Sequence, residues 1–102
     1  MNKFYYTYVL ASIDYQMLYI GYSENVQKRL ASHNAKENTA TKPYAPYELV
    51  FYEAFLNKRD ALNREVYLKS GWGRRSLNKM LKVYLANNRT DLIALDYQVI
   101  AR

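Results

Sequence analysis

The sequence predicts a small α/β domain in which a three-stranded antiparallel sheet is flanked by helices. Two apolar, aromatic-rich runs lie close together near the N-terminus, and a third follows a polar loop. Segments with the apolar spacing of amphipathic helices come after the second and the third run. A chain of 102 residues, half of them hydrophobic, supports one compact core and leaves no room for a second.

The three strands are expected at residues 4–12, 17–22 and 47–55. Each run is rich in aromatic and β-branched residues, which favour strands. The short turn between the first two makes them a hairpin. Gly21 interrupts the second run, and this predicts either a bulge or a place where another group comes close to the backbone.

Helices are expected at residues 26–34, from Asn57 to about residue 70, and at 73–85. Asn57 supplies an N-cap, and Gly71 is well placed just past the end of the helix that Asn57 opens. Residues 35–46 are mostly polar and contain both prolines, so they predict a surface loop. The expected order is therefore β-β-α-β-α-α plus a tail.

The tail, residues 86–102, is ambiguous. Thr90 and Asp91 could cap a short helix, and residues 97–100 could form a strand. We therefore expect a folded domain at 1–85 and a C-terminal extension that packs on it or lies at an oligomer contact.

The composition narrows the classes of function. The chain has no cysteine, which excludes disulfides, thiolate metal ligands and a cysteine nucleophile. It shows neither a signal-peptide pattern nor a stretch near the roughly 18 apolar residues of a membrane span, so we expect a soluble cytoplasmic protein with no membrane partner. The net charge of +6 favours a nucleic-acid partner, although a merely soluble basic protein has the same balance.

Glu65 breaks the local pattern. It lies within the apolar stripe that Ala61, Leu62 and Leu68 form on one face of their predicted helix. Burial of an unpaired carboxylate costs on the order of several kcal/mol, so this group needs a cationic partner. A metal ion or an arginine in an internal ion pair would serve.

Arg29 is the second exception, because it borders the apolar face made by Val26, Leu30 and His33. Its side chain could extend outward to solvent, or it could direct its guanidinium into a cleft, where the planar fork suits a phosphate. His33 near the helix C-terminus has a simpler reading as a partner of the helix dipole.

Basic residues gather after Glu65, with five between positions 69 and 82 and no acidic residue among them. They either track phosphates or form a solvated helix face. The residues expected to bind nucleic acid are Lys28, Lys42, Lys69, Arg74, Arg75, Lys79 and Lys82. Trp72 could stack on a base, but a place capping the hydrophobic core is favoured.

Four short motifs, in order and correctly spaced, resemble those of the GIY-YIG nuclease family. Tyr6-Thr7-Tyr8 stands at the first motif, and Tyr19-Ile20-Gly21 is the second one intact. Arg29 and Glu65 follow in the helices where the family carries an arginine and a glutamate. The stretches TATKPYAPYELVFYE and DALNREVYLKSGWGRR are similar to small stand-alone members, which look like the N-terminal domain of the excinuclease C subunit.

The resemblance implies hydrolysis of phosphodiesters with one divalent metal ion, Mg²⁺ or Mn²⁺. The residue that matches the metal ligand is Glu65. Arg29 would neutralise charge in the transition state, Tyr8 or Tyr19 would help to deprotonate the attacking water, and His33 would assist as a proton relay or phosphate donor. The expected function is that of a structure-selective DNA endonuclease, acting on branched, damaged or single-stranded DNA in repair or recombination.

The sequence departs from the family pattern in three ways. Thr7 replaces the glycine of the first motif, and Tyr22 follows Gly21 where excinuclease-type members have a lysine. A late asparagine has no clear counterpart. Since the missing lysine would lower the pKa of a tyrosine, the alternative is a weakly active or inactive nucleic-acid-binding module of the same fold, with a protein-interaction adaptor a more distant option.

Overall fold

The strand pairing of the N-terminal hairpin organises the whole domain. The computed structural model describes residues 2–87 and 97–100. Strand β1 (Tyr5–Ser12) pairs antiparallel with both β2 (Met17–Ser23) and β3 (Tyr47–Phe55), so it is the central strand of the three. The sequence prediction of these three strands is confirmed to within a residue at each end.

The prediction of a purely antiparallel, three-stranded sheet is wrong. A fourth strand, β4 (Gln98–Val99), pairs parallel to β2, which makes a mixed sheet of order β3-β1-β2-β4. Backbone hydrogen bonds from Gln98 to Gln16 and from Ile100 to Leu18 hold it. Two residues are too few to show an alternating pattern, so the sequence left this segment open. The proposed cap at Thr90 and Asp91 lies outside the described residues.

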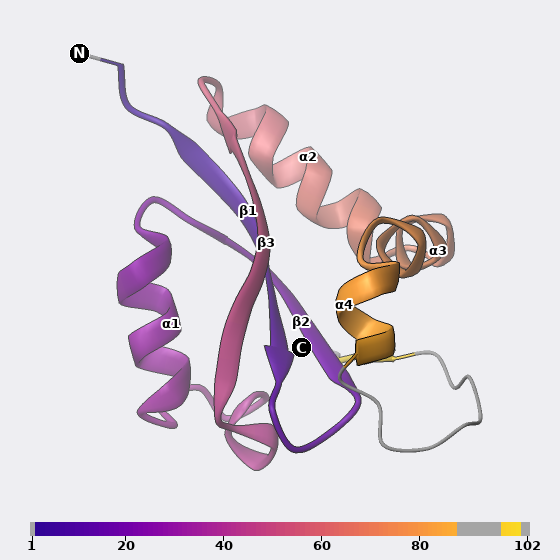
Figure 1. The fold of residues 1–102 in the computed structure, drawn as a ribbon. Coiled ribbons are helices and arrows are strands. Elements are labelled where there is room, and N and C mark those ends of the chain that lie inside the picture. The colour runs from indigo at the N-terminus through magenta and orange to yellow at the C-terminus, as the bar shows by residue number, and fades with distance from the viewer. Residues whose placement is uncertain (1, 88–96, 101–102) are drawn as a thin grey trace.

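Helices cover both faces of the sheet (Figure 1). Helix α1 (Val26–Asn34) lies on one face, and the opposite face carries α2 (Lys58–Lys69), α3 (Gly71–Met80) and α4 (Lys82–Asn87). A 3-10 turn, η1 (Lys42–Tyr44), precedes β3. No helix in the described part of the chain is both long and apolar enough to cross a bilayer.

Local capping explains where α1 and α2 begin. The side chains of Asn25 and Asn57 accept hydrogen bonds from the backbone N–H groups of Lys28 and Arg59, which would otherwise lack partners. The bounds predicted for the first helix and the N-cap at Asn57 are confirmed.

The prediction after α2 is wrong in two details. Gly71 does follow Ser70, the C-cap of α2, but it has no positive φ and also opens α3, because the Ser70 hydroxyl caps the new helix by accepting from the Gly73 N–H. The helix expected to run unbroken through residues 73–85 is interrupted at Leu81, and this break lets α4 place Leu85 on the same core as Leu77.

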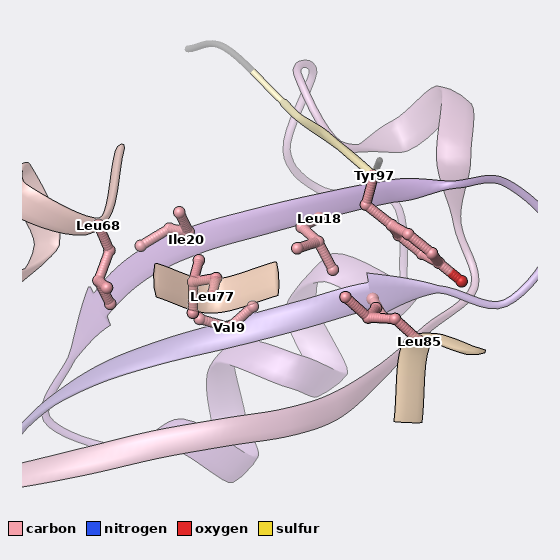
Figure 2. Packing of buried hydrophobic residues seen from close by; sticks show 8 residues of the cluster. Val9, Leu18, Ile20, Leu68, Leu77, Leu85 and Tyr97 are labelled. Atoms are coloured by element: carbon pink, nitrogen blue, oxygen red, sulfur yellow. The ribbon is translucent and has the colours of Figure 1, made fainter. Parts of the chain in front are cut away.

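Alternate residues of the strands build two apolar cores, one on each face of the sheet. On the α2–α4 face the strand residues meet Leu68, Leu77, Leu85 and Tyr97 (Figure 2). On the α1 face the cluster is richer in tyrosine, and its buried members are Tyr8, Leu10, Tyr19, Val26, Tyr47 and Ile100. The tyrosines of the two motifs therefore belong to the α1 face.

Candidate active site

The ring of Tyr8 lies across the backbone of Gly21. The two residues are opposite each other in the β1–β2 register, and a β-carbon at position 21 would overlap the phenol ring and its hydroxyl. Of the two predictions for Gly21, a close approach is the one that the structure shows. The glycine lets the Tyr8 hydroxyl pass over β2, whose 19–23 segment has no further strand beside it among the described residues.

The Tyr8 hydroxyl reaches a buried chain of polar groups. It lies 3.0 Å from Nε2 of His33, and Nδ1 of His33 lies 2.8 Å from the hydroxyl of Thr41. Thr41 can donate in turn to the carbonyl of Asn38 at 3.4 Å. With this direction of donation, Nδ1 carries the imidazole proton and Nε2 accepts from the Tyr8 hydroxyl.

Thr41 was missed by the sequence reasoning, which placed residues 35–46 in a surface loop. It is completely buried, and the Tyr47 hydroxyl donates to its carbonyl oxygen at 2.5 Å. Since the histidine that needs Thr41 lies eight residues earlier in a different element, no local pattern distinguishes Thr41 from its polar neighbours.

The surroundings of His33 and Tyr8 shift the pKa values of the two side chains in opposite directions. Burial, together with the positive charge of Arg29, lowers the pKa of His33 to about 4, so this imidazole is neutral at pH 7. Burial raises the pKa of Tyr8, while hydrogen bonding to Arg29 opposes the rise. At neutral pH the resting pair is therefore a phenol donating to a neutral imidazole.

Arg29 and Tyr19 complete this side of the site. Tyr19 is buried, and its ring centroid lies 4.7 Å from that of His33. Arg29 interacts with both tyrosines, and hydrogen bonding to Tyr8 raises the pKa of its guanidinium. The Nε atom of Arg29 is buried and has no hydrogen-bond partner within the part of the chain that the structure describes. This arginine therefore turns inward and keeps a donor available.

Glu65 approaches the same tyrosine from α2. Its side chain is buried, as the apolar stripe predicted, and its negative charge contributes to the raised pKa of Tyr8. Its carboxylate accepts a hydrogen bond from Lys69 Nζ at 2.8 Å, one helical turn away. This partner is a lysine, whereas the sequence pattern predicts a metal ion or an arginine.

The donor set around Glu65 limits which metal it could hold. Residues 2–87 and 97–100 contain no cluster of three histidine, cysteine, aspartate or glutamate side chains. A zinc site normally needs three or four such protein ligands, whereas Mg²⁺ is commonly bound by one or two carboxylates, with water and substrate phosphate filling the remaining positions. A single buried carboxylate, with water and a substrate phosphate to complete the coordination, fits Mg²⁺ or Mn²⁺.

Four of the seven predicted nucleic-acid-binding residues are brought together. Arg74, Arg75, Lys79 and Lys82 line one cleft of about 1160 Å³ over α3, α4 and the start of β4. The other three do not line this cleft: Lys28 is on α1, Lys42 begins η1, and Lys69 is bonded to Glu65.

The placement expected for Trp72 is wrong. Its side chain is 71% exposed and lines the basic cleft, so it does not cap the hydrophobic core. The reason is local: α3 begins at Gly71, two residues earlier than predicted, and so the residues facing the core are Gly73 and Leu77.

Comparison with known proteins agrees with this arrangement. The family model for the GIY-YIG catalytic domain matches residues 4–80. A UPF0213 protein of Pediococcus acidilactici is 39% identical over 90 residues, which cover 85% of each chain. Another, HQ_3675A of Haloquadratum walsbyi, is 34% identical over 93 residues, covering 90% of this chain and 97% of the relative.

The matched family model spans both motif strands and the helices that carry Arg29 and Glu65. The two relatives match over 85% and 97% of their own sequences. The chain therefore belongs to the GIY-YIG family, whose catalytic domain is a nuclease domain and implies a nucleic-acid substrate.

Proposed function

We propose that this protein is a metal-dependent endonuclease that hydrolyses DNA phosphodiester bonds. The observation that carries the proposal is the buried, unpartnered Nε of Arg29 beside Tyr8. A buried donor without an acceptor is costly, and a phosphate oxygen is the acceptor that best suits a guanidinium fork. Glu65 lies close enough to act on the same tyrosine, so an anionic substrate would sit between a cation-binding carboxylate and an arginine.

Glu65 is the residue that we propose to hold the divalent ion. When bound, the ion would polarise the scissile phosphate and stabilise the charge that develops on the leaving oxygen. Glu65 is buried on α2 between Ala61 and Leu68, which are also buried. Lys69 must release the carboxylate oxygen that it now contacts, and its ammonium is then available to a nearby phosphate.

Tyr8 is the tyrosine that we propose to activate water. Its oxygen would accept a proton from the water while its own proton passes to Nε2 of His33, 3.0 Å away. The low pKa of His33 opposes this transfer in the free protein, partly because of the charge on Arg29. A phosphate bound to Arg29 offsets that charge and makes the imidazole a better acceptor. Substrate binding thus favours the proton relay.

The protein is proposed to select its substrates by nucleic-acid structure and not by base sequence. The cleft over α3 and α4 supplies four cations, which recognise the phosphate backbone without reading bases. Such contacts orient a strand and leave cleavage to depend on how the substrate bends or branches. A role in DNA repair or recombination would follow from activity on branched, damaged or single-stranded substrates.

A cleavage assay tests the proposal. Duplex, single-stranded, branched and RNA substrates are incubated with wild type and Glu65→Gln in Mg²⁺, Mn²⁺ or EDTA. We expect metal-dependent nicking of DNA by wild type and a loss of about 10²-fold or more in the variant. Glu24→Gln changes an exposed carboxylate that pairs with Lys3 and is the matched control. Thermal unfolding supplies a second readout, since Mn²⁺ should stabilise wild type and not Glu65→Gln.

The binding-module alternative is favoured by one observation, the ion pair that already neutralises Glu65 in the protein. It predicts salt-dependent binding of DNA with no cleavage of any substrate in the panel and no Mn²⁺-dependent shift in melting temperature. Cleavage that disappears in Glu65→Gln excludes it.

A further inference from the structure

Trp72 is held out to solvent by a rigid elbow between α2 and α3. Ser70 caps α3 through the Gly73 N–H at 3.1 Å. A β-carbon at Gly73 would collide with the Tyr67 carbonyl and with the backbone of Leu68, so the two helices touch at this point. The indole, 71% exposed, therefore projects from a constrained stretch of backbone and takes no part in core packing. Exposure of so large an apolar side chain forgoes about 1.5–3 kcal/mol of burial, which points to a ligand.

The surroundings of Trp72 are cationic. The guanidinium of Arg75 lies 4.9 Å from the centroid of the Trp72 ring, which is a cation–π contact. The same cleft is lined by Arg74, Lys79 and Lys82, and none of its described lining residues is acidic. A cleft of this charge complements an anionic polymer. Its exposed aromatic ring adds a stacking surface that phosphate contacts alone do not need.

We infer that Trp72 and Arg75 form a stacking platform for an unpaired base, so that the substrate presents single-stranded nucleic acid to the cleft. This inference rests on the proposed nuclease function and specifies its substrate. Aromatic rings combined with a positively charged groove are the usual means of binding single strands, because every base has a face that stacks. In a duplex the base faces are already stacked on each other, and Trp72 would gain nothing. Trp72 follows Lys69, which contacts Glu65, by three residues along the chain, at the junction of α2 and α3.

The chain contains a single tryptophan, so its fluorescence reports on this site directly. The full chain, in EDTA to prevent cleavage, is titrated with a short oligothymidylate while tryptophan emission is followed. Stacking should quench the emission. An abasic oligonucleotide of the same length carries the same phosphates and no bases, and it should leave the emission nearly unchanged.

Three variants separate stacking from charge. Trp72→Ala should weaken binding of the single strand by about fivefold to a hundredfold, measured by anisotropy of a labelled oligonucleotide, with the salt dependence unchanged. Lys79→Gln should reduce the slope of log affinity against log salt by about 0.7, since it removes one phosphate contact. Trp72→Phe should keep most of the affinity. Tyr52→Ala removes an exposed aromatic ring on β3 and is the matched control, with no change expected.

Three results would overturn the inference. They are equal quenching by the abasic strand, unchanged affinity of Trp72→Ala for single strands, and an equal loss of affinity for fully paired duplex. Equal quenching by polyglutamate of the same length would reassign the cleft to acidic proteins. The nuclease proposal is tested separately, by Glu65→Gln. Cleavage without stacking would contradict only the stacking platform, and stacking without cleavage would contradict only the nuclease proposal.

Discussion

The ammonium group of Lys69 lies 2.8 Å from the carboxylate of Glu65, one turn further along α2. A lysine thus hydrogen-bonds to one oxygen of the carboxylate that the proposed metal ion would bind. The two cations would compete for this oxygen, and the lysine keeps a buried negative charge balanced when no metal is present.

Replacement of Lys69 by methionine is expected to increase Mn²⁺ affinity by about fivefold, because a competing charge worth about 1 kcal/mol is removed. The measurement is a Mn²⁺ titration followed by the paramagnetic signal of the free ion or by melting temperature. Lys79→Met removes a cleft lysine and should leave the titration unchanged. An identical affinity in wild type and Lys69→Met would show that the two cations do not compete.

Gly21→Ala tests the close approach of Tyr8. The added β-carbon overlaps the phenol ring, and relief of the overlap displaces Tyr8 from His33, at a cost of about 1–3 kcal/mol in unfolding free energy. Cleavage should fall together with stability. Gly71→Ala is the control, because nothing lies within 4 Å of its added β-carbon, and its stability should change by about 1 kcal/mol or less. Equal melting temperatures for the two variants would contradict the crowding at Gly21.

Tyr8→Phe and Tyr19→Phe identify the tyrosine that moves the proton. Both variants keep a ring in the α1-face core, so they should fold, but Tyr8→Phe loses the hydroxyl that contacts His33. We expect kcat to fall by about 10²–10⁴-fold for Tyr8→Phe, and less for Tyr19→Phe. Single-turnover cleavage at saturating protein is the measurement. A larger loss from Tyr19→Phe would transfer the role to that residue.

The low pKa of His33 makes stability depend on pH. Its pKa is about 4 in the folded protein, against an ordinary value of 6.5, so the unfolded chain takes up the proton first as pH falls. Stability contributed by the neutral imidazole is therefore complete above about pH 6.5 and is lost toward pH 4, by up to about 3 kcal/mol. Denaturant unfolding of wild type and His33→Asn across this range gives the difference. Parallel curves for the two proteins would show that His33 is not the source.

The sequence predicted those parts of the site that leave a local signature. Glu65 stood out because a carboxylate interrupted an apolar stripe, and Gly21 because a glycine interrupted a strand. In the structure the Tyr8 ring lies against Gly21, the charge of Glu65 acts on the Tyr8 hydroxyl, and Arg29 hydrogen-bonds to the same hydroxyl. The roles of these residues in catalysis remain predictions that the variants above address.

Features that depend on distant partners could not be predicted in this way. The burial of Thr41 follows from its contact with His33. A strand at residues 97–100 was one of the options for the tail, and it is present at Gln98–Val99, but its parallel pairing with β2 left no local signature. Trp72 is exposed because the Ser70 hydroxyl caps α3, which therefore begins at Gly71, two residues before the predicted start. Propensity and periodicity give no information about such contacts, since they describe only neighbours along one helix or strand.

The parallel pairing of β4 with β2 has a consequence for how the chain is made. Gln98 pairs with Met17, so the sheet is completed by residues synthesised about eighty positions apart. The hairpin and α1 can form early on the ribosome, whereas this edge waits until residues 98–99 have been synthesised, and the long loop adds to the entropic cost of closing it. A nascent chain therefore carries every candidate catalytic residue before it has β4 and Tyr97, which belongs to the same core cluster as Leu18 and Leu85.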